Sequence, residues 1–264
     1  MKKILFILSV IAFLLSCEKK ADFNANFVPL DSNLYTNYKF INAYSYATPV
    51  FSGQTSASVL LTHNGVQFSS GTPITVGTTY PASIGYAALF KQIAGLPMNI
   101  RMVLGTQPAL TKDSLLFTYY GPSLSRYYSL FFCDSINKPN SILVTEDDLR
   151  LPGGPNLYRV RFVNLIPNPP TLTPAIDVYS TNAGALIFTG IPFKKATPFL
   201  ELPRNSIATT FTDTYQIRWT GTSTVIATLS SVQLNNQMSL TLFAKGFVGA
   251  TGLRAPGLLS YRNN

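Results

Sequence analysis

The chain has 264 residues and a formal net charge of +9, with 12% charged and 46% hydrophobic residues. One histidine and two cysteines cannot supply the several Cys and His ligands of the common zinc sites, so that class is excluded. The basic residues are scattered, and their nearest approach to a cluster is Lys194, Lys195 and Arg204. We therefore interpret the positive charge as a solvated face rather than a polyanion site.

The first segment has the composition of a secretory signal. Lys2 and Lys3 precede an almost entirely apolar run from Ile4 to Leu15, and Ser16 and Cys17 follow it. A membrane-spanning helix needs about 20 apolar residues, and this run has only 12. A signal is therefore favoured over a transmembrane anchor.

The order of charge, apolar core, small residue and cysteine resembles the signal peptides of bacterial lipoproteins. The resemblance implies cleavage between Ser16 and Cys17, a diacylglycerol on the Cys17 sulfur, and acylation of the new amino group. We expect residues 1–16 to be removed and the protein to be lipid-anchored in the cell envelope, at the outer membrane. The periplasmic and surface faces both stay open, because Glu18 to Asp22 lacks a run of acids. A nucleic-acid partner is not expected for an exported protein.

Residues 17–37 show no sustained periodicity and are predicted to be a tether, followed by a first domain over residues 38–150. In this domain apolar residues alternate with polar ones, as at Ile100, Met102 and Leu104, which predicts strands. Asn64-Gly65 predicts a hairpin. Ser83 to Ala94 fits either a helix or a strand followed by a turn, and we favour the strand.

Two short segments join the predicted domains. Thr145 to Leu149 is predicted to form one capped helical turn, with Asp148 reaching back to the Thr145 amide. Leu151 to Pro155 then interrupts regular structure and marks the boundary of a second domain over residues 151–264.

The second domain repeats the pattern of the first. Tyr158, Val160 and Phe162 alternate with arginines, and alternation recurs around Ile217 and Leu240. Lys39-Phe40-Ile41-Asn42 and Arg161-Phe162-Val163-Asn164 open the two halves 122 residues apart, and each half finishes with a Ser-Leu-aromatic strand. The fold class predicted is all-β, with two tandem β-sandwiches.

The stretch from Glu146 to Pro203 resembles the bacterial envelope family known as domain of unknown function 4397. The matching elements are an acidic pair, a Pro/Gly connector, an Arg-aliphatic-Arg-aromatic-Val-Asn strand, a proline loop, and later strands: Asp147-Asp148-Leu149, Pro152-Gly153-Gly154, Arg159 to Asn164, Pro167 to Pro170, Ile176-Asp177-Val178-Tyr179 and Phe199 to Pro203. The resemblance implies immunoglobulin-like sandwiches on an exported protein and no established activity. The loop from Ile166 to Pro174 is longer than in the family, and Arg204-Asn205 replaces a glycine.

Few residues offer catalytic chemistry. Cys133 is expected to be a buried inert thiol and His63 an exposed turn residue. Glycoside hydrolysis needs only two carboxylates, but the cluster at Glu146 to Asp148 is predicted to be a solvated cap rather than a catalytic pair or calcium site. Asp177 points outward from its strand, and we expect it to bond a neighbouring loop. Asp213 completes the set of carboxylates considered.

Paired tyrosines are the main candidate binding feature, because exposed aromatic rings form flat platforms for sugars or proteins. The pairs are Tyr44 with Tyr46, Tyr119 with Tyr120, and Tyr127 with Tyr128, and most are interpreted as core or cross-strand residues. The function predicted is a non-catalytic interaction or accessory module of the envelope, without metal or cofactor. A carbohydrate-binding surface lipoprotein is the alternative, and a carboxylate-dependent hydrolase is a remote alternative. The partners considered are envelope proteins and glycans.

Overall fold

The computed structural model describes residues 35–46, 59–63, 66–67, 74–82, 84–90, 98–104, 114–119, 126–135, 142–167, 175–204 and 211–264. The predicted signal, the lipid site at Cys17 and most of the tether lie outside these residues. In the described part, every regular element is a β-strand except the 3-10 helix Gly252–Arg254. The predicted all-β class is therefore confirmed.

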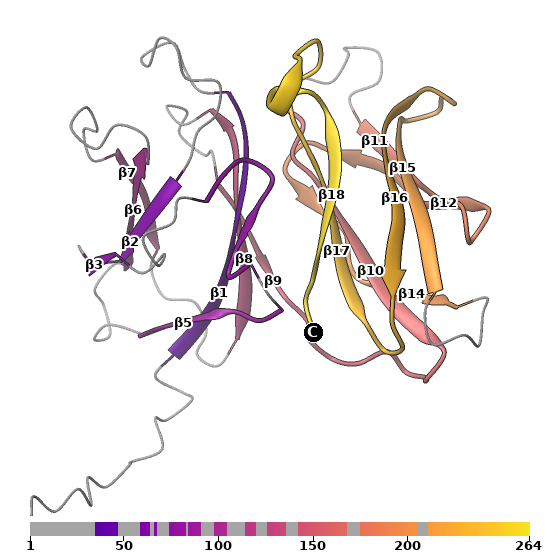
Figure 1. Cartoon of the computed structure of the whole chain (residues 1–264), viewed down its shortest axis with the longest axis horizontal. Coiled ribbons are helices and arrows are strands. Elements are labelled where there is room, and N and C mark those ends of the chain that lie inside the picture. The colour runs from indigo at the N-terminus through magenta and orange to yellow at the C-terminus, as the bar shows by residue number, and fades with distance from the viewer. Residues whose placement is uncertain are drawn as a thin grey trace, which may run out of the picture.

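The first half of the chain forms two sheets, which we name A and B (Figure 1). Sheet A has the order β4-β1-β8-β9, with β5 also on β1. Its strands are β1 (Tyr35–Tyr46), β4 (Thr79–Tyr80), β5 (Ala87–Phe90), β8 (Tyr127–Ser135) and β9 (Ile142–Glu146). Sheet B has the order β3-β2-β6-β7, built from β2 (Val59–His63), β3 (Val66–Gln67), β6 (Met98–Leu104) and β7 (Ser114–Tyr119).

Two predictions for this half are confirmed. Strands β2 and β3 pair antiparallel with His63 opposite Val66, as the hairpin at Asn64-Gly65 requires. The ambiguous segment contains strand β5, which pairs with the start of β1, while the turn predicted after the strand lies outside the described residues. Strand β1 begins at Tyr35, inside the last residues of the predicted tether.

The second half forms sheets C and D with the same strand order as A and B (Figure 1). Sheet C runs β13-β10-β17-β18 with β14 on β10, and its strands are β10 (Leu157–Asn164), β13 (Lys195–Ala196), β14 (Leu200–Pro203), β17 (Ser239–Lys245) and β18 (Gly257–Arg262). Sheet D runs β12-β11-β15-β16, with β11 (Ala175–Ser180), β12 (Ala185–Pro192), β15 (Phe211–Trp219) and β16 (Val225–Leu234). The internal repeat predicted from sequence therefore appears as a repeated topology.

The repeat also extends to individual residues. In both halves the opening strand pairs in parallel with the Ser/Thr-Leu-Phe strand, Ile41 opposite Phe131 and Val163 opposite Phe243. Asn42 and Asn164 occupy equivalent buried positions, and each side-chain amide donates to a backbone carbonyl, of Ile74 at 2.8 Å and of Ile191 at 2.9 Å. The shared Phe-aliphatic-Asn pattern therefore fixes the end of each opening strand.

The core of the second half lies between sheets C and D. Tyr158, Val160 and Phe162 of β10 point into it, together with Ile176 and Val178 of β11. The predicted alternation of β10 is confirmed, because its apolar face is buried. The side chains of Ile100, Met102 and Leu104 lie outside the described residues. The opposite face of β10, which carries Arg159 and Arg161, is buried as well, because sheet C also packs on sheet A.

A glycine sets the geometry of the connection between β17 and β18. Gly246 has a φ of +105°, and a Cβ at this position would overlap the backbone carbonyl of Ala255. Gly184, in the turn between β11 and β12, also has a positive φ of +63°, but it faces open space.

We predict that Gly246→Ala lowers the free energy of unfolding on the order of 3 kcal/mol, because it adds a backbone overlap to an unfavourable φ. Gly184→Ala carries only the conformational cost and is expected to lose about 1 kcal/mol. Urea denaturation of both variants measures the difference, and equal losses would contradict the assigned overlap.

Candidate functional site at the interface of the two halves

Sheets A and C face each other across an apolar core. Ile41 and Phe131 contribute from sheet A, and Val163 and Phe243 contribute from the equivalent positions of sheet C. The rings of Phe131 and Phe243 lie 6.1 Å apart. Each half therefore presents the same face to the other. Cys133 is buried in this core, as predicted for an inert thiol.

A buried polar network continues the interface beside this apolar core. Asp147 follows β9 and is paired with Arg161 of β10, and both side chains are almost completely buried. The hydroxyls of Tyr86 and Ser129 each donate to Asp147 Oδ2 at 2.6 Å. The carboxylate thus has one charged and two neutral donors, which offset the cost of its burial.

The guanidinium of Arg161 is also fully engaged. Its Nη2 donates to the Tyr261 hydroxyl at 3.1 Å, and its Nε donates to Thr241 Oγ1 at 2.9 Å. Tyr261 in turn donates to Ser129 Oγ at 2.7 Å. A continuous chain of donors therefore runs from Arg161 through Tyr261 and Ser129 to the carboxylate, and it crosses from one half to the other.

The same constellation occurs in each half. By strand register, four positions of the first half correspond to four of the second half: a cation, an aromatic ring, a hydroxyl and a polar residue after the last strand. The corresponding pairs are Lys39 and Arg161, Tyr86 and Phe199, Ser129 and Thr241, and Asp147 and Asn263. Both cations lie over their ring, Lys39 Nζ at 5.6 Å from the Tyr86 centroid and Arg161 Cζ at 4.9 Å from that of Phe199. Ser129 donates to Asp147, and Thr241 donates to Asn263 at 2.7 Å. The site is therefore duplicated, but only the copy in the first half carries a negative charge, at Asp147.

Burial shifts the ionisation of this site. It lowers the pKa of the Lys39 ammonium to about 8, and the charge of Asp147 opposes that shift. Burial also raises the pKa of the Tyr86 and Tyr261 phenols, so both stay neutral donors. Lys39 Nζ donates to the carbonyls of Gly85 and Pro81 at 2.8 and 3.2 Å, which positions the ammonium.

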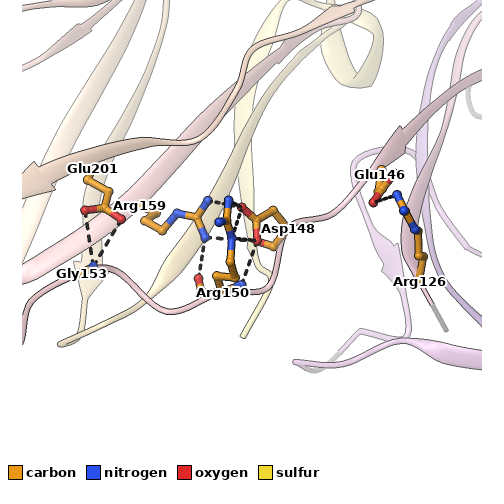
Figure 2. Close-up of polar contacts among 7 residues, drawn as sticks. All are labelled: Arg126, Glu146, Asp148, Arg150, Gly153, Arg159 and Glu201. Atoms are coloured by element: carbon orange, nitrogen blue, oxygen red, sulfur yellow. Dashed lines mark hydrogen bonds and ion pairs between the residues drawn. The ribbon is translucent and has the colours of Figure 1, made fainter.

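The connector between the halves is fixed by ion pairs on both sides of Asp147 (Figure 2). Glu146 binds Arg126 at 2.5 Å in a half-exposed pair. Asp148 accepts from Arg159 Nη2 at 2.7 Å and from the exposed Arg150 at 2.8 Å. These bonds hold the Asp148 carboxyl in its charged form and lower its pKa. These ion pairs therefore hold the connector in a single conformation between the halves.

The prediction for this segment is wrong in three respects. Thr145 to Leu149 form no helical turn, because β9 runs to Glu146 and residues 147–150 have no regular secondary structure. Asp148 bonds the Arg150 amide at 3.0 Å rather than reaching back to Thr145. Asp147 is not part of a solvated cap, since it is buried and paired with Arg161, which is distant in sequence. Arg204, expected on a solvated face, is also buried.

The remaining candidate carboxylates hold loops in place. Asp177 points away from the core as predicted, but it is buried by donors from strand β12 and from the turn after β15: Gly190 N at 2.7 Å, Thr220 Oγ1 at 2.9 Å and Gly221 N at 3.2 Å. Its expected loop-bonding role is confirmed. Asp213 accepts from Ser180 Oγ at 2.6 Å and from Asn182 N at 2.9 Å. Both carboxylates therefore stabilise turns of sheet D.

The tyrosine pairs separate into described and undescribed residues. Tyr127 is 37% exposed and Tyr128 is buried, so that pair has one member on each face. The side chains of Tyr44, Tyr46, Tyr119 and His63, and all of Tyr120, lie outside the described residues. Among the described residues, no group of three His, Cys, Asp or Glu side chains could hold a metal ion.

Comparisons with known proteins give little similarity. No family model and no curated protein matches the chain. A leucine-rich repeat protein from Bacteroides thetaiotaomicron VPI-5482, solved at 2.80 Å resolution, is 14% identical over 83% of this chain and 26% of that one, with a TM-score of 0.18. The chain thus spans about a quarter of the length of that structure. Within the described part, no helix is long and apolar enough to cross a membrane.

We predict that Asp147→Ala lowers the free energy of unfolding by about 3 to 5 kcal/mol, because it leaves the Arg161 charge buried without its partner. The neighbouring Glu146→Gln is the matched control, and its half-exposed pair is expected to contribute at most about 1 kcal/mol. Chemical denaturation measures both changes. A small effect at Asp147 would show that the interface does not depend on this ion pair.

The lowered pKa of Asp148 predicts a pH-dependent contribution to stability. Its stabilisation is complete above the unfolded pKa of about 4 and is lost as the pH falls toward the lower folded pKa. Asp148→Asn should therefore cost up to about 1 kcal/mol at pH 7 and less at pH 3, after allowance for solvent screening. Urea unfolding at the two pH values tests this, and a pH-independent difference would contradict it.

Proposed function

We propose that the protein is a lipid-anchored component of the cell envelope, at the outer membrane, that acts as a non-catalytic interaction or accessory module. Its two halves are proposed to be immunoglobulin-like sandwiches, a signal peptide over residues 1–16 is removed, and the lipid is carried by Cys17. The order of basic start, apolar core, Ser16 and Cys17 supports the anchor. The repeated topology and the resemblance to the family of unknown function support the two-domain arrangement.

One observation carries the non-catalytic part of this proposal: every buried carboxylate among the described residues has structural partners. Asp147 holds the interface, while Asp177 and Asp213 hold turns. A general acid or base needs a carboxylate that faces a substrate cleft. The exposed Glu146 and the partly exposed Asp148 also bind arginines. This distribution favours a structural use of the acids over hydrolysis.

The tyrosines favour a module that does not rely on an aromatic platform. Tyr38, Tyr128, Tyr158, Tyr215 and Tyr261 are buried, while Tyr127 is partly exposed and packs edge-on against Tyr86. A stacking platform for sugars needs several exposed coplanar rings. Among the described tyrosines, this arrangement gives less support to stacking than to polar recognition.

The two cysteines allow a matched test of the anchor. We predict that the mature protein begins at a diacylated Cys17 and incorporates labelled palmitate in a lipoprotein-processing host. Cys17→Ala should abolish incorporation and processing, whereas Cys133→Ala should leave both unchanged. Mass spectrometry of the N-terminus provides the measurement, and an unmodified Cys17 or a retained Met1 to Ser16 would overturn the localisation.

A further inference from the structure

A groove opens beside the interface where the two halves meet strand β18. Its volume of about 540 Å³ is within the usual range for ligand pockets. Residues of both halves of the chain line it. The first half contributes Lys39 and the segment after β4, and the second half contributes β16 and β18. Figure 1 shows β16 and β18 on sheets D and C of the second half. The groove therefore exists only when the halves are docked.

The charged residues that line the groove have one sign. Lys39 and Arg262 line it, and none of its lining residues is a carboxylate. The lining also includes hydroxyl and amide side chains, among them Ser231, Gln233 and Ser260. Apolar side chains such as Met238 are present as well. Two cations, neutral hydrogen-bonding groups and a partly apolar wall suit an anion that carries hydroxyl groups.

Arg262 carries a charge that no described residue balances. No described residue forms an ion pair or hydrogen bond with its guanidinium, and its buried Nε lacks an acceptor. The equivalent position of the first half is Glu146, which is paired with Arg126. The repeat thus places opposite charges at equivalent positions, and among the described residues only the acidic one has an oppositely charged partner. An unpaired arginine is a suitable partner for a carboxylate.

The strand opposite Arg262 is distorted at the groove. Strand β16 shifts register against β15 between Val232 and Leu229. Ser231 lies in this bulge with a φ of 54°, a left-handed conformation that is unfavourable for a residue with a Cβ. A β-bulge redirects side chains at the edge of a sheet and is often found next to functional sites. The distortion therefore occurs where the groove presents its hydroxyl groups.

We propose that this groove binds a sugar acid, a saccharide unit carrying a carboxylate, with Arg262 as the main carboxylate partner and Lys39 as a second positive charge. Ser231, Gln233 and Ser260 would bond the ligand hydroxyls. The inference deepens the proposed interaction role by naming a ligand class. It does not depend on the lipid anchor, so the groove and the Cys17 modification can fail separately.

The test is isothermal titration of the purified full-length chain in detergent with trigalacturonate, at low ionic strength, with neutral galactotriose as the uncharged probe. We expect saturable binding of trigalacturonate and at least tenfold weaker binding of galactotriose. Arg262→Gln should weaken trigalacturonate binding about tenfold or more, because it removes a charge-assisted hydrogen bond. Arg262→Lys should recover part of the affinity, because it keeps the charge.

Lys195→Gln is the matched control, since it removes one positive charge from an exposed site on β13 outside the groove lining. It should change the affinity by less than twofold. Unfolding midpoints of the Arg262 variants establish that the fold is retained. Equal binding by wild type and Arg262→Gln, equal binding of the neutral probe, no binding of trigalacturonate, or binding only to vesicles of anionic phospholipid would each overturn the proposal.

Discussion

The way sheet A lies on sheet C depends on one buried ion pair, between Asp147 and Arg161. Either charge alone would be costly at this site, because both side chains are almost completely buried beside the apolar core. The pair forms only when the end of β9 reaches β10, so it specifies how sheet A lies on sheet C. The adjacent apolar core contributes attraction, but apolar contacts alone tolerate sliding. The hydrogen bonds from Tyr86 and Ser129 then allow one position of the carboxylate.

This constraint explains why the central strands carry few exposed residues. Strands β1 and β10 each lie between two packed layers, and most of their described side chains are buried on both faces. Strands that are covered on both sides normally consist of continuous apolar runs. Here Lys39, Arg159 and Arg161 occupy one covered face, which is possible because aromatic rings and acids meet them. The same covering creates the groove where Lys39 approaches β18.

The sequence predicts the strands better than it predicts their surroundings. Alternation at Tyr158, Val160 and Phe162 identifies a core face, since a period of two is a local property. The same pattern cannot show what covers Arg161, because Tyr86 and Tyr261 come from distant parts of the chain. Three adjacent acids therefore suggested a solvated turn. The sequence does contain one signal of the buried site. Lys39-Phe40-Ile41-Asn42 matches Arg161-Phe162-Val163-Asn164 from the first residue of each run, which is a cation in both, and these cations occupy equivalent positions on facing strands.

The repeated face has a consequence for assembly. Two copies of one surface that meet through equivalent residues form an isologous contact, the kind that usually joins the subunits of a homodimer. In this protein the connector places both copies in one molecule, so the contact forms at a high effective concentration set by the linker. A homodimer dissociates on dilution, but this internal pair cannot. The groove at its edge therefore keeps its two walls at any protein concentration.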